Sequence, residues 1–455
     1  MIRRHSILSR LGPADTTKLK MIDPRSVITE IQFIDGEKRL GYGLGQIVDQ
    51  LARRGLYPTE GAVDLLILAG TITAADTRIN RGSESQDSWT REIDLYVPVS
   101  SPDRWNPVAR LMERMLHFLT GDRWRLFFRA RHKVYKKLIE RPLLNVKPPF
   151  SSVCLFSGGL DSFTGAIDLL EDGENPVFVS HYWDASTSSQ LPCAAFLSKE
   201  YGNFDTRHVR ARVGFPHDLV SGSSGEDTLR GRSFLFFGLA ALTASCFEGE
   251  SNIFVPENGL ISLNVPLDPL RLGAWSTRTT HPFYMARWQE LFDTLGFPFT
   301  LENPYRFKTK GEMFSQCKNK HFLKKHAHET ISCSSYTKAR YKKLSLGHCG
   351  YCVPCLIRRA SLETAFGQDR TEYRIVPDLT SQTLDASKAE GEGVRSFQLM
   401  ASRLKRKPEL ARLLIHKSGP LSDYKDSEIN EYAGVFLRGI TEVGKLLKDV
   451  NVKPL

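Results

Sequence analysis

The stretch VCLFSGGLDSFTGAIDLL, residues 153–170, places a short apolar run, a Ser-Gly-Gly-Leu-Asp-Ser turn and a second apolar run in immediate succession. The first run predicts a buried strand and the second predicts a helix. Neither common glycine-rich phosphate motif fits, because the turn matches neither G-x-x-x-x-G-K-[ST] nor G-x-G-x-x-G. Whatever fold the chain adopts must accommodate this strand-to-helix turn with its two consecutive glycines.

The segments around this turn alternate between strand and helix. Strands are predicted at 151–156, 176–183, 204–214 and 252–259, and helices at 162–173, 188–202 and 231–249. The second helix is expected to be interrupted near Pro192. This alternation over residues 150–370 predicts an α/β fold with a parallel sheet covered by helices on both faces.

The predicted secondary structure at the two ends of the chain differs from that of this central region. Residues 1–145 are predicted to form a mixed α/β region, joined to the rest by a proline-containing linker at 141–150. Its expected elements are strands at 62–79, 91–99 and 123–134, a long hairpin through 80–90, and a helix over 104–122 that ends at Gly121. Residues 371–455 are rich in helix formers and predict helices at 396–419 and 428–450.

The turn has the composition of an anion cradle. Gly158 and Gly159 allow positive φ and a close approach to a ligand, and the helix start directs unpaired N–H groups at the same spot. Ser157 and Ser162 add hydroxyl groups. Asp161 would repel a phosphate, so it predicts a divalent cation between the two; alternatively it is the N-cap of the helix, and both roles can coexist.

Composition and charge limit the kinds of partner that the protein is expected to bind. No apolar run approaches the roughly 20 residues that span a bilayer, and the N-terminus lacks the apolar core of a secretory signal, so we expect a soluble, cytoplasmic protein with no membrane partner. The chain of 455 residues carries a net charge of +11, and residues 306–343 hold eleven Lys or Arg and two Glu. This stretch is either a surface for nucleic acid or an acidic partner, or a solvated face.

Four of the eight cysteines are grouped. Cys349, Cys352 and Cys355 have C-x₂-C-x₂-C spacing, and Cys333 precedes them by sixteen residues. Four thiolates suit tetrahedral zinc in a closed structural site. An iron–sulfur cluster is the rival, and the distant fourth cysteine favours zinc. The other four are expected to be core thiols: Cys154, Cys193, Cys246 and Cys317.

The turn SGGLDS resembles the signature of the PP-loop ATP pyrophosphatases, which adenylate a substrate and release pyrophosphate. Together with the cysteine group, residues 150–365 resemble the 7-cyano-7-deazaguanine synthase (QueC) family. RGRSFLFFGLAALTA resembles a family segment that would bring Arg232 near the nucleotide phosphates. NPYRFKTKGEMF resembles another, with Lys310 matching its lysine.

The resemblance implies a PP-loop sheet with a structural zinc site, and ATP, Mg²⁺ and Zn²⁺ as cofactors. It implies that ATP is bound by Ser157, Gly158, Gly159, Leu160, Asp161 and Ser162. Asp161, Lys310 and Arg232 would be the catalytic residues, and Cys333, Cys349, Cys352 and Cys355 the metal ligands.

The chain also departs from the family. Ser233 stands where the family has Asn, residues 256–288 differ from its substrate-contacting stretch, and both terminal regions are additions. These features resemble the QueC-like proteins of bacterial anti-phage defence operons, most closely the QatC branch of the Qat system. The resemblance implies a carbon–nitrogen ligase that activates a carboxylate, expected to be a deazaguanine-type base, and joins it to an amine. In the defence branch this amine is expected to belong to a partner protein from the same operon. A nucleotide-binding adaptor and a housekeeping 7-cyano-7-deazaguanine synthase are the alternatives.

Overall fold

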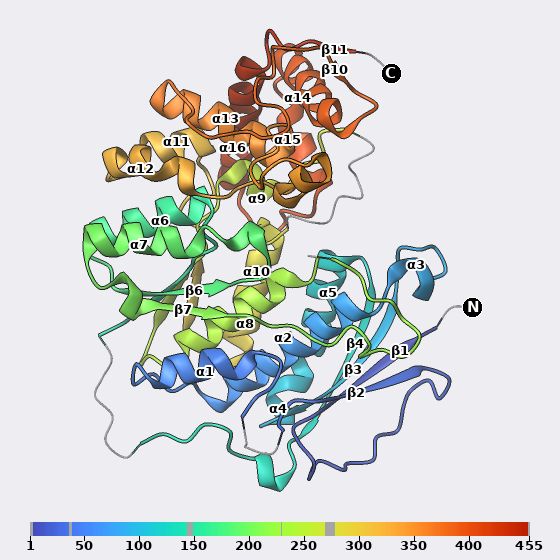
Figure 1. Ribbon diagram of the computed structural model, residues 1–455. Coiled ribbons are helices and arrows are strands. Elements are labelled where there is room, and N and C mark those ends of the chain that lie inside the picture. The colour runs from blue at the N-terminus through green and yellow to red at the C-terminus, as the bar shows by residue number, and fades with distance from the viewer. Residues whose placement is uncertain (1–2, 36–38, 143–148, 229, 269–277, 454–455) are drawn as a thin grey trace.

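The computed structural model describes residues 3–35, 39–142, 149–228, 230–268 and 278–453. It is a mixed α/β structure with two parallel sheets, one in the N-terminal part of the chain and one in the centre, followed by a C-terminal group of helices. In Figure 1 the N-terminal sheet lies at the lower right, the central sheet at the left and the C-terminal helices at the top. The predicted α/β class with a parallel sheet is confirmed.

The elements of the N-terminal part are β1 His5–Arg10, β2 Val27–Gln32, α1 Leu44–Ala52, α2 Glu60–Arg78, α3 Arg81–Glu84, β3 Glu92–Val99, α4 Pro102–Trp105, α5 Ala109–Thr120 and β4 Arg123–Ala130. Those of the central part are β5 Ser152–Leu155, α6 Leu160–Glu171, β6 Pro176–His181, α7 Gln190–Tyr201, β7 His208–Ala211, α8 Arg232–Ala244, β8 Ser251–Phe254, α9 Gly259–Leu263, α10 Pro282–Leu295, β9 Phe299–Glu302, α11 Lys310–Ser315, α12 Lys320–His326 and α13 Val353–Phe366. The C-terminal elements are β10 Leu384–Asp385, α14 Ala389–Arg406, α15 Leu410–Leu414, α16 Asp426–Leu446 and β11 Val452–Lys453. Short 3-10 turns lie at Asn106–Val108, Lys133–Tyr135, Ala185–Thr187, Phe204–Arg207, Ala327–Glu329, Tyr336–Lys342 and Ile415–Lys417.

The central sheet has the strand order β7-β6-β5-β8-β9, and all its pairs are parallel. The chain runs outward from β5 to β7 and then returns to the other side of β5 with β8. The connections after β5 and β8 therefore diverge, which opens a crevice at the carboxyl ends of these two strands. The Ser-Gly-Gly-Leu-Asp-Ser turn directly follows β5, so the topology places it in this crevice.

The N-terminal part departs most from the sequence prediction. Residues 62–79 were predicted as a strand, but residues 62–78 belong to helix α2 and Ile79 is its C-cap residue. The N-cap Thr59 accepts a hydrogen bond from the backbone N–H of Ala62. The β-branched residues of this run suggested a strand, but α2 is buried over almost its whole circumference, so it shows no amphipathic period. The predicted hairpin through 80–90 is also wrong, because β3 pairs in parallel with β1 and β4. The helix predicted over 104–122 ends at Gly121 as expected, but it is divided into α4, a 3-10 turn at Asn106–Val108 and α5.

Helices α2 and α8 join the two sheets. They pack on each other, α2 contacts β3 of the N-terminal sheet, and α8 contacts β5, β6 and β8 of the central sheet. Gly238 of α8 makes this approach possible, because a Cβ there would lie 3.0 Å from the Cβ of Ala69. One hydrophobic core runs through both sheets, so the regions on either side of the predicted boundary near residue 145 share a buried interior.

Helix α1 covers the outer edge of the central sheet. Gln50 accepts a hydrogen bond from the backbone N–H of Arg210 in β7 and donates one to its carbonyl oxygen. Gln46, one turn earlier, accepts from the backbone N–H of Arg212. Two glutamines at i and i+4 thus take the place of a neighbouring strand and satisfy polar groups that an edge strand leaves unpaired.

The central helices and strands lie close to their predicted positions. Pro192 does not interrupt α7, because it occupies the first turn, where its missing N–H has no intrahelical partner to lose. The predicted strand at 204–214 is shorter, since Phe204–Arg207 form a 3-10 turn before β7. Residues 143–148 of the expected linker lie outside the described residues.

The C-terminal helices form a second core around α13, α14 and α16. This core includes Cys333, Cys349 and Cys355, so the predicted metal site lies at the base of the helical region. Within the described residues, no helix combines the length and the apolar character that crossing a membrane requires.

Candidate active site and metal centre

The turn after β5 is built around one left-handed glycine. Gly158 has a φ of +75°, and a Cβ there would lie 2.8 Å from the backbone nitrogen of Gln190, so a side chain is excluded both by conformation and by space. Gly159 has a φ of −78° and needs no glycine conformation. The expectation of positive φ at both glycines therefore holds only for Gly158.

The start of α6 presents backbone N–H groups without a side-chain cap. Gly159 is the N-cap residue and has no side chain that could cap the first turn; its own N–H donates a 3.2 Å hydrogen bond to the hydroxyl of Ser157. The N–H of Leu160 has only a long bond of 3.4 Å to the hydroxyl of Ser332. The hydroxyls of Ser157 and Ser162 lie 3.1 Å apart beside these groups. A helix start with free donors and two hydroxyls has the chemistry of an anion site.

Asp161 does not cap the helix. Its carboxylate forms an ion pair of 3.0 Å with the ammonium group of Lys310 and accepts a hydrogen bond of 2.8 Å from the side-chain amide of Asn258. Both charged side chains are buried, with exposed fractions of 7% for Lys310 and 8% for Asp161. The N-cap alternative is therefore wrong, and the structure brings together two of the three predicted catalytic residues.

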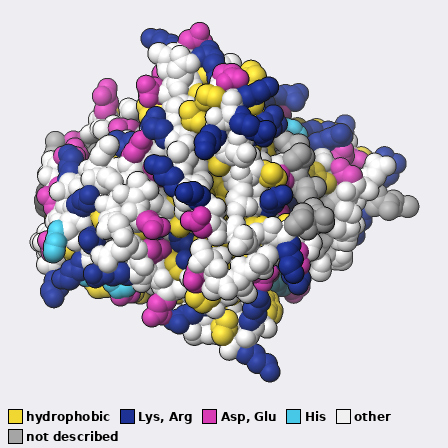
Figure 2. Space-filling model, turned by 90° about the horizontal axis from the view of Figure 1, so that it is seen from above, with side chains coloured by type: hydrophobic (Ala, Val, Ile, Leu, Met, Phe, Trp, Pro, Cys, Tyr) yellow, Lys and Arg dark blue, Asp and Glu magenta, His cyan; other side chains and the backbone are white. Residues whose placement is uncertain are grey.

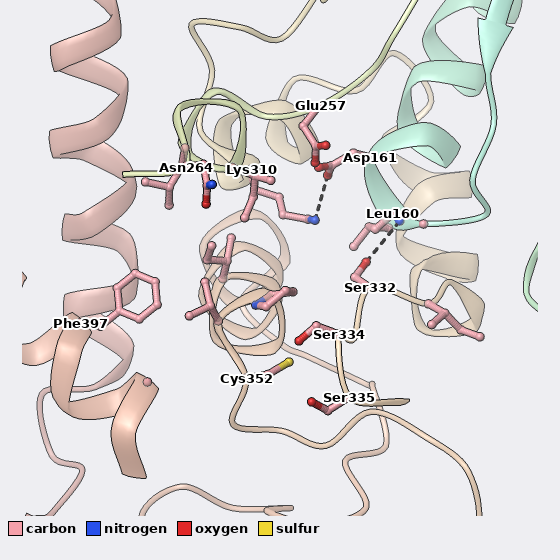
Figure 3. Close-up of a pocket in the computed structure, with 18 of the residues that line it drawn as sticks. Leu160, Asp161, Glu257, Asn264, Lys310, Ser332, Ser334, Ser335, Cys352 and Phe397 are labelled. Atoms are coloured by element: carbon pink, nitrogen blue, oxygen red, sulfur yellow. Dashed lines mark hydrogen bonds and ion pairs between the residues drawn. The ribbon is translucent and has the colours of Figure 1, made fainter. Parts of the chain in front are cut away.

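Glu257 is a site residue that the sequence prediction missed. It follows β8 and lies beside Asp161 (Figure 3). Burial raises the pKa of Glu257 to about 8; the nearby charge of Asp161 adds to the rise and that of Lys310 opposes it. The available signal was its position in the PENG segment after a core strand, opposite the phosphate loop across the crevice.

The stability of the protein should therefore depend on pH through Glu257. Because the folded-state pKa is above that of the unfolded chain, the carboxyl group contributes its full stability below about pH 4.5, and this contribution is lost as the pH rises through about 8. We expect Glu257→Gln to remove a decline of up to about 1.4 kcal/mol per pH unit in this window. Urea unfolding at pH 5, 7 and 9 measures the difference from wild type.

The exposed Glu250, just before β8, provides the control. Glu250→Gln should retain the pH dependence of the wild-type protein. A difference in unfolding free energy between Glu257→Gln and wild type that stays constant from pH 5 to 9 would contradict the assignment.

Arg232, the third predicted catalytic residue, contacts another set of described residues than this pair. It begins α8, and its guanidinium lies 4.9 Å from the ring centroid of Phe236. Burial lowers the pKa of Arg232 to about 10, and the pKa of His181 falls to about 3 through burial and the charge of Arg232. His181 and Phe236 line a small chamber of about 120 Å³ beside Ser157 and Ser162, but Arg232 is not among the described residues that line it.

A larger cavity of about 670 Å³ opens in front of the turn. Its polar end holds Ser157, Asp161, Ser162, Glu257 and Lys310. At the opposite end the C-terminal helices contribute Phe397 and Phe436, while α13 and the metal cluster contribute Val353, Ile357 and Cys352. Figure 3 shows Phe397 across the cavity from Lys310 and Asp161. Of the segment at 256–288 that was expected to form a wall, Pro256, Leu260, Asn264 and Leu267 line the cavity. Residues 269–277 lie outside the described part.

The four grouped cysteines form a cluster that can hold a metal ion such as zinc. Their sulfur atoms all lie within 4.8 Å of one another, with 3.8 Å between Cys333 and Cys352 and 3.9 Å between Cys349 and Cys355. Ligands at about 2.3 Å around a tetrahedral zinc ion lie about 3.8 Å apart, so the spacing fits. Backbone N–H groups of Ser335, Cys349 and Cys352 point at the sulfurs at 3.3 Å, which favours thiolates.

The remaining cysteines are not part of this cluster. Cys154, Cys193 and Cys317 are buried and Cys246 is half-buried. Burial raises the pKa of Cys193 to about 12, so its thiol stays protonated, as expected of a core cysteine.

Comparison with known proteins adds no family assignment. No protein-family model matches the chain, and no curated protein matches it significantly.

Proposed function

We propose that the protein is an ATP-dependent adenylating enzyme of the QueC-like, PP-loop type. The observation that carries this proposal is the uncapped start of α6, which faces a 670 Å³ cavity next to the buried Asp161–Lys310 pair. A cavity of this size accommodates a nucleotide together with a small substrate. Free helix N–H groups, two hydroxyls and an ammonium group match the negative charge of a triphosphate.

The residues also fit a divalent cation. Asp161 and Glu257 place two carboxyl groups side by side, and burial together with their mutual repulsion raises the pKa of Glu257. A cation such as Mg²⁺ relieves this repulsion, and carboxylate oxygens are the ligands it prefers. When bound, Mg²⁺ would neutralise charge on the phosphate oxygens and on the leaving pyrophosphate.

In the proposed reaction a substrate carboxylate attacks the α-phosphate of ATP, pyrophosphate leaves, and an amine then displaces AMP from the acyl-adenylate. The start of α6 and the hydroxyls of Ser157 and Ser162 hold the phosphates in place. Lys310 stabilises the negative charge that develops during attack, and Asp161 keeps its ammonium group oriented. The role of Arg232 at the phosphates stays a prediction, because Arg232 is not among the described residues that line either cavity.

We propose zinc as the ion of the Cys₄ cluster, with a structural role. Four cysteine ligands leave no open position for catalysis. Cys352 lines the cavity, and α13, which begins at the next residue, supplies Ile357 to the wall. A metal here would hold one wall of the cavity in position.

Pyrophosphate release from ATP is the direct test of adenylation. A chain that binds ATP without releasing pyrophosphate, even with the other proteins of its operon present, would favour the adaptor alternative. Robust conversion of free 7-carboxy-7-deazaguanine to the nitrile with ammonia would favour the housekeeping synthase. We expect this conversion to be inefficient, and we propose that the acceptor is instead an amine of a partner protein in a bacterial anti-phage defence system.

Phe397 should contribute to binding of the carboxylate substrate. Loss of an aromatic contact is worth about 0.5–1.5 kcal/mol, so Phe397→Leu should raise the KM for 7-carboxy-7-deazaguanine about threefold to tenfold and leave the KM for ATP unchanged. Steady-state pyrophosphate release with each substrate varied measures both constants. Leu399→Ala, on the same helix but 52% exposed, is the matched control. Equal changes in both KM values would contradict this role.

Nucleic-acid binding by residues 306–343 stays a prediction. Of the eleven Lys and Arg in this stretch, Arg306, Lys310, Lys318 and Lys342 form ion pairs with acidic residues. Figure 2 shows Lys and Arg spread over one face of the molecule and interleaved with Asp and Glu. An interleaved surface is typical of a solvated face.

A further inference from the structure

A second large cavity lies away from the phosphate loop. It has a volume of about 690 Å³ and forms where the start of α1 and the end of α2 meet the segments after β6 and β7. None of its described lining residues lines either of the two chambers at the phosphate loop. The proposed function leaves this cavity without a role.

One side of the cavity is aromatic. The rings of Tyr42 and Phe215 stack with centroids 4.6 Å apart and planes 28° from parallel. Trp183, two residues beyond the end of β6, is half-buried and also lines the cavity. Half-buried aromatic rings in a concave site offer flat surfaces on which a planar ligand can stack.

The polar side of the cavity is cationic. Arg78 is only 6% exposed, and its guanidinium donates two hydrogen bonds to the carbonyl oxygen of Phe215, at 2.6 and 3.1 Å, and one of 2.9 Å to that of Thr77, so it offers a ligand its charge and its remaining N–H groups. Arg212 and His217 are exposed at the mouth, and the side chain of Arg212 has no hydrogen-bond or ion-pair partner among the described residues. Asp227 is the one acidic residue among the described residues that line the cavity. The excess of cationic donors favours an anionic ligand.

The shape of the cavity is held by backbone contacts between the two parts of the chain. The N–H of Gly214 donates a hydrogen bond to the carbonyl oxygen of Tyr42. Gly43 has a φ of +87°, and a Cβ there would lie 1.7 Å from the carbonyl oxygen of Arg212. Only glycine allows this approach, so the backbone that carries Tyr42 and Arg212 is held in place before any ligand arrives.

From this combination we infer that the cavity between α1, α2 and β7 binds a nucleoside phosphate. The base stacks on the aromatic side, against Trp183 and Tyr42. Arg212, Arg78 and His217 bind the phosphate. The site is separate from the phosphate loop, and the inference does not depend on the proposed function.

Isothermal titration calorimetry of the full chain with AMP and GMP tests this inference. The titrations are made in a Lys310→Met background, which weakens nucleotide binding at the phosphate loop. We expect at least one of the two nucleotides to bind in this background, and Arg212→Glu or Trp183→Ala to weaken its binding at least tenfold. Arg53→Glu, which reverses an exposed charge at the end of α1 outside the cavity, should have no effect.

Adenosine and inorganic phosphate serve as half-ligands. Each should bind at least tenfold more weakly than AMP or GMP, because each engages only one side of the cavity. Binding of neither nucleotide in the Lys310→Met background, or binding that Arg212→Glu leaves unchanged, would overturn the inference. So would inorganic phosphate that binds as tightly as the nucleotides. Failure of the proposed adenylation would appear separately, as absence of pyrophosphate release by the wild-type chain.

Discussion

Replacing Lys310 by Met should lower pyrophosphate release at least about 100-fold, the effect of removing one preorganised charge from a transition state. Lys310 lines the cavity in front of the start of α6, and its ammonium group is held 3.0 Å from Asp161. Met keeps most of the apolar stem of the side chain and removes the ammonium group with its charge and its hydrogen-bond donors. Release of pyrophosphate from ATP, with the carboxylate substrate saturating, is the measurement.

A double variant separates this loss of activity from a loss of folding. Asp161→Asn alone leaves the buried ammonium of Lys310 without its partner, which costs on the order of 3–5 kcal/mol of stability. In Asp161→Asn combined with Lys310→Met, both charges are gone and most of this stability should return. The double variant should stay inactive. Wild-type rates in it would show that the pair has no part in the chemistry.

Cys352→Ser should abolish metal binding and destabilise the C-terminal half of the protein. The four sulfurs can hold one ion, and a structural zinc site contributes binding free energy directly to folding, about 10–16 kcal/mol in isolated zinc-finger peptides. We expect the metal content of the purified protein to fall from one zinc per chain to nearly none. The unfolding free energy should fall by several kcal/mol. Elemental analysis and thermal unfolding provide the two measurements.

Cys246→Ser is the matched control, because Cys246 is a half-buried cysteine outside the cluster. It should keep a full complement of zinc. Iron instead of zinc in the purified wild-type protein would support the iron–sulfur alternative. Full metal content in Cys352→Ser would show that the cluster is not the site.

Loss of the metal in Cys352→Ser should also affect the active site. Cys352 lies in the cavity wall and α13 begins directly after it. Loss of the metal should therefore weaken substrate binding as well as stability, whereas Lys310→Met should leave the metal content unchanged. Measuring the zinc content of both variants distinguishes activity that is lost because the cavity wall is disturbed from activity that is lost because the charge of Lys310 is missing.

The sequence alone determined the local parts of this site. The strand, the Gly158 turn and the helix of residues 153–170 are encoded by neighbouring residues, because a short apolar run, a glycine and a helix-forming run act over a few positions. The sequence equally predicted the Cys₄ set, since C-x₂-C-x₂-C spacing places three sulfurs around one point. The central parallel sheet followed from the alternation of strands and helices.

The surroundings of these parts depend on the tertiary structure. Residues 62–78 form a helix because burial between two sheets outweighs the strand preference of their β-branched side chains. Glu257 and Lys310 meet at Asp161 because the parallel order β5-β8-β9 places the turn after β5, the segment after β8 and the segment after β9 at one edge of the sheet. Phe397 closes the cavity from a helix more than two hundred positions beyond the phosphate loop. Such contacts depend on chain topology, which no local pattern of residues specifies.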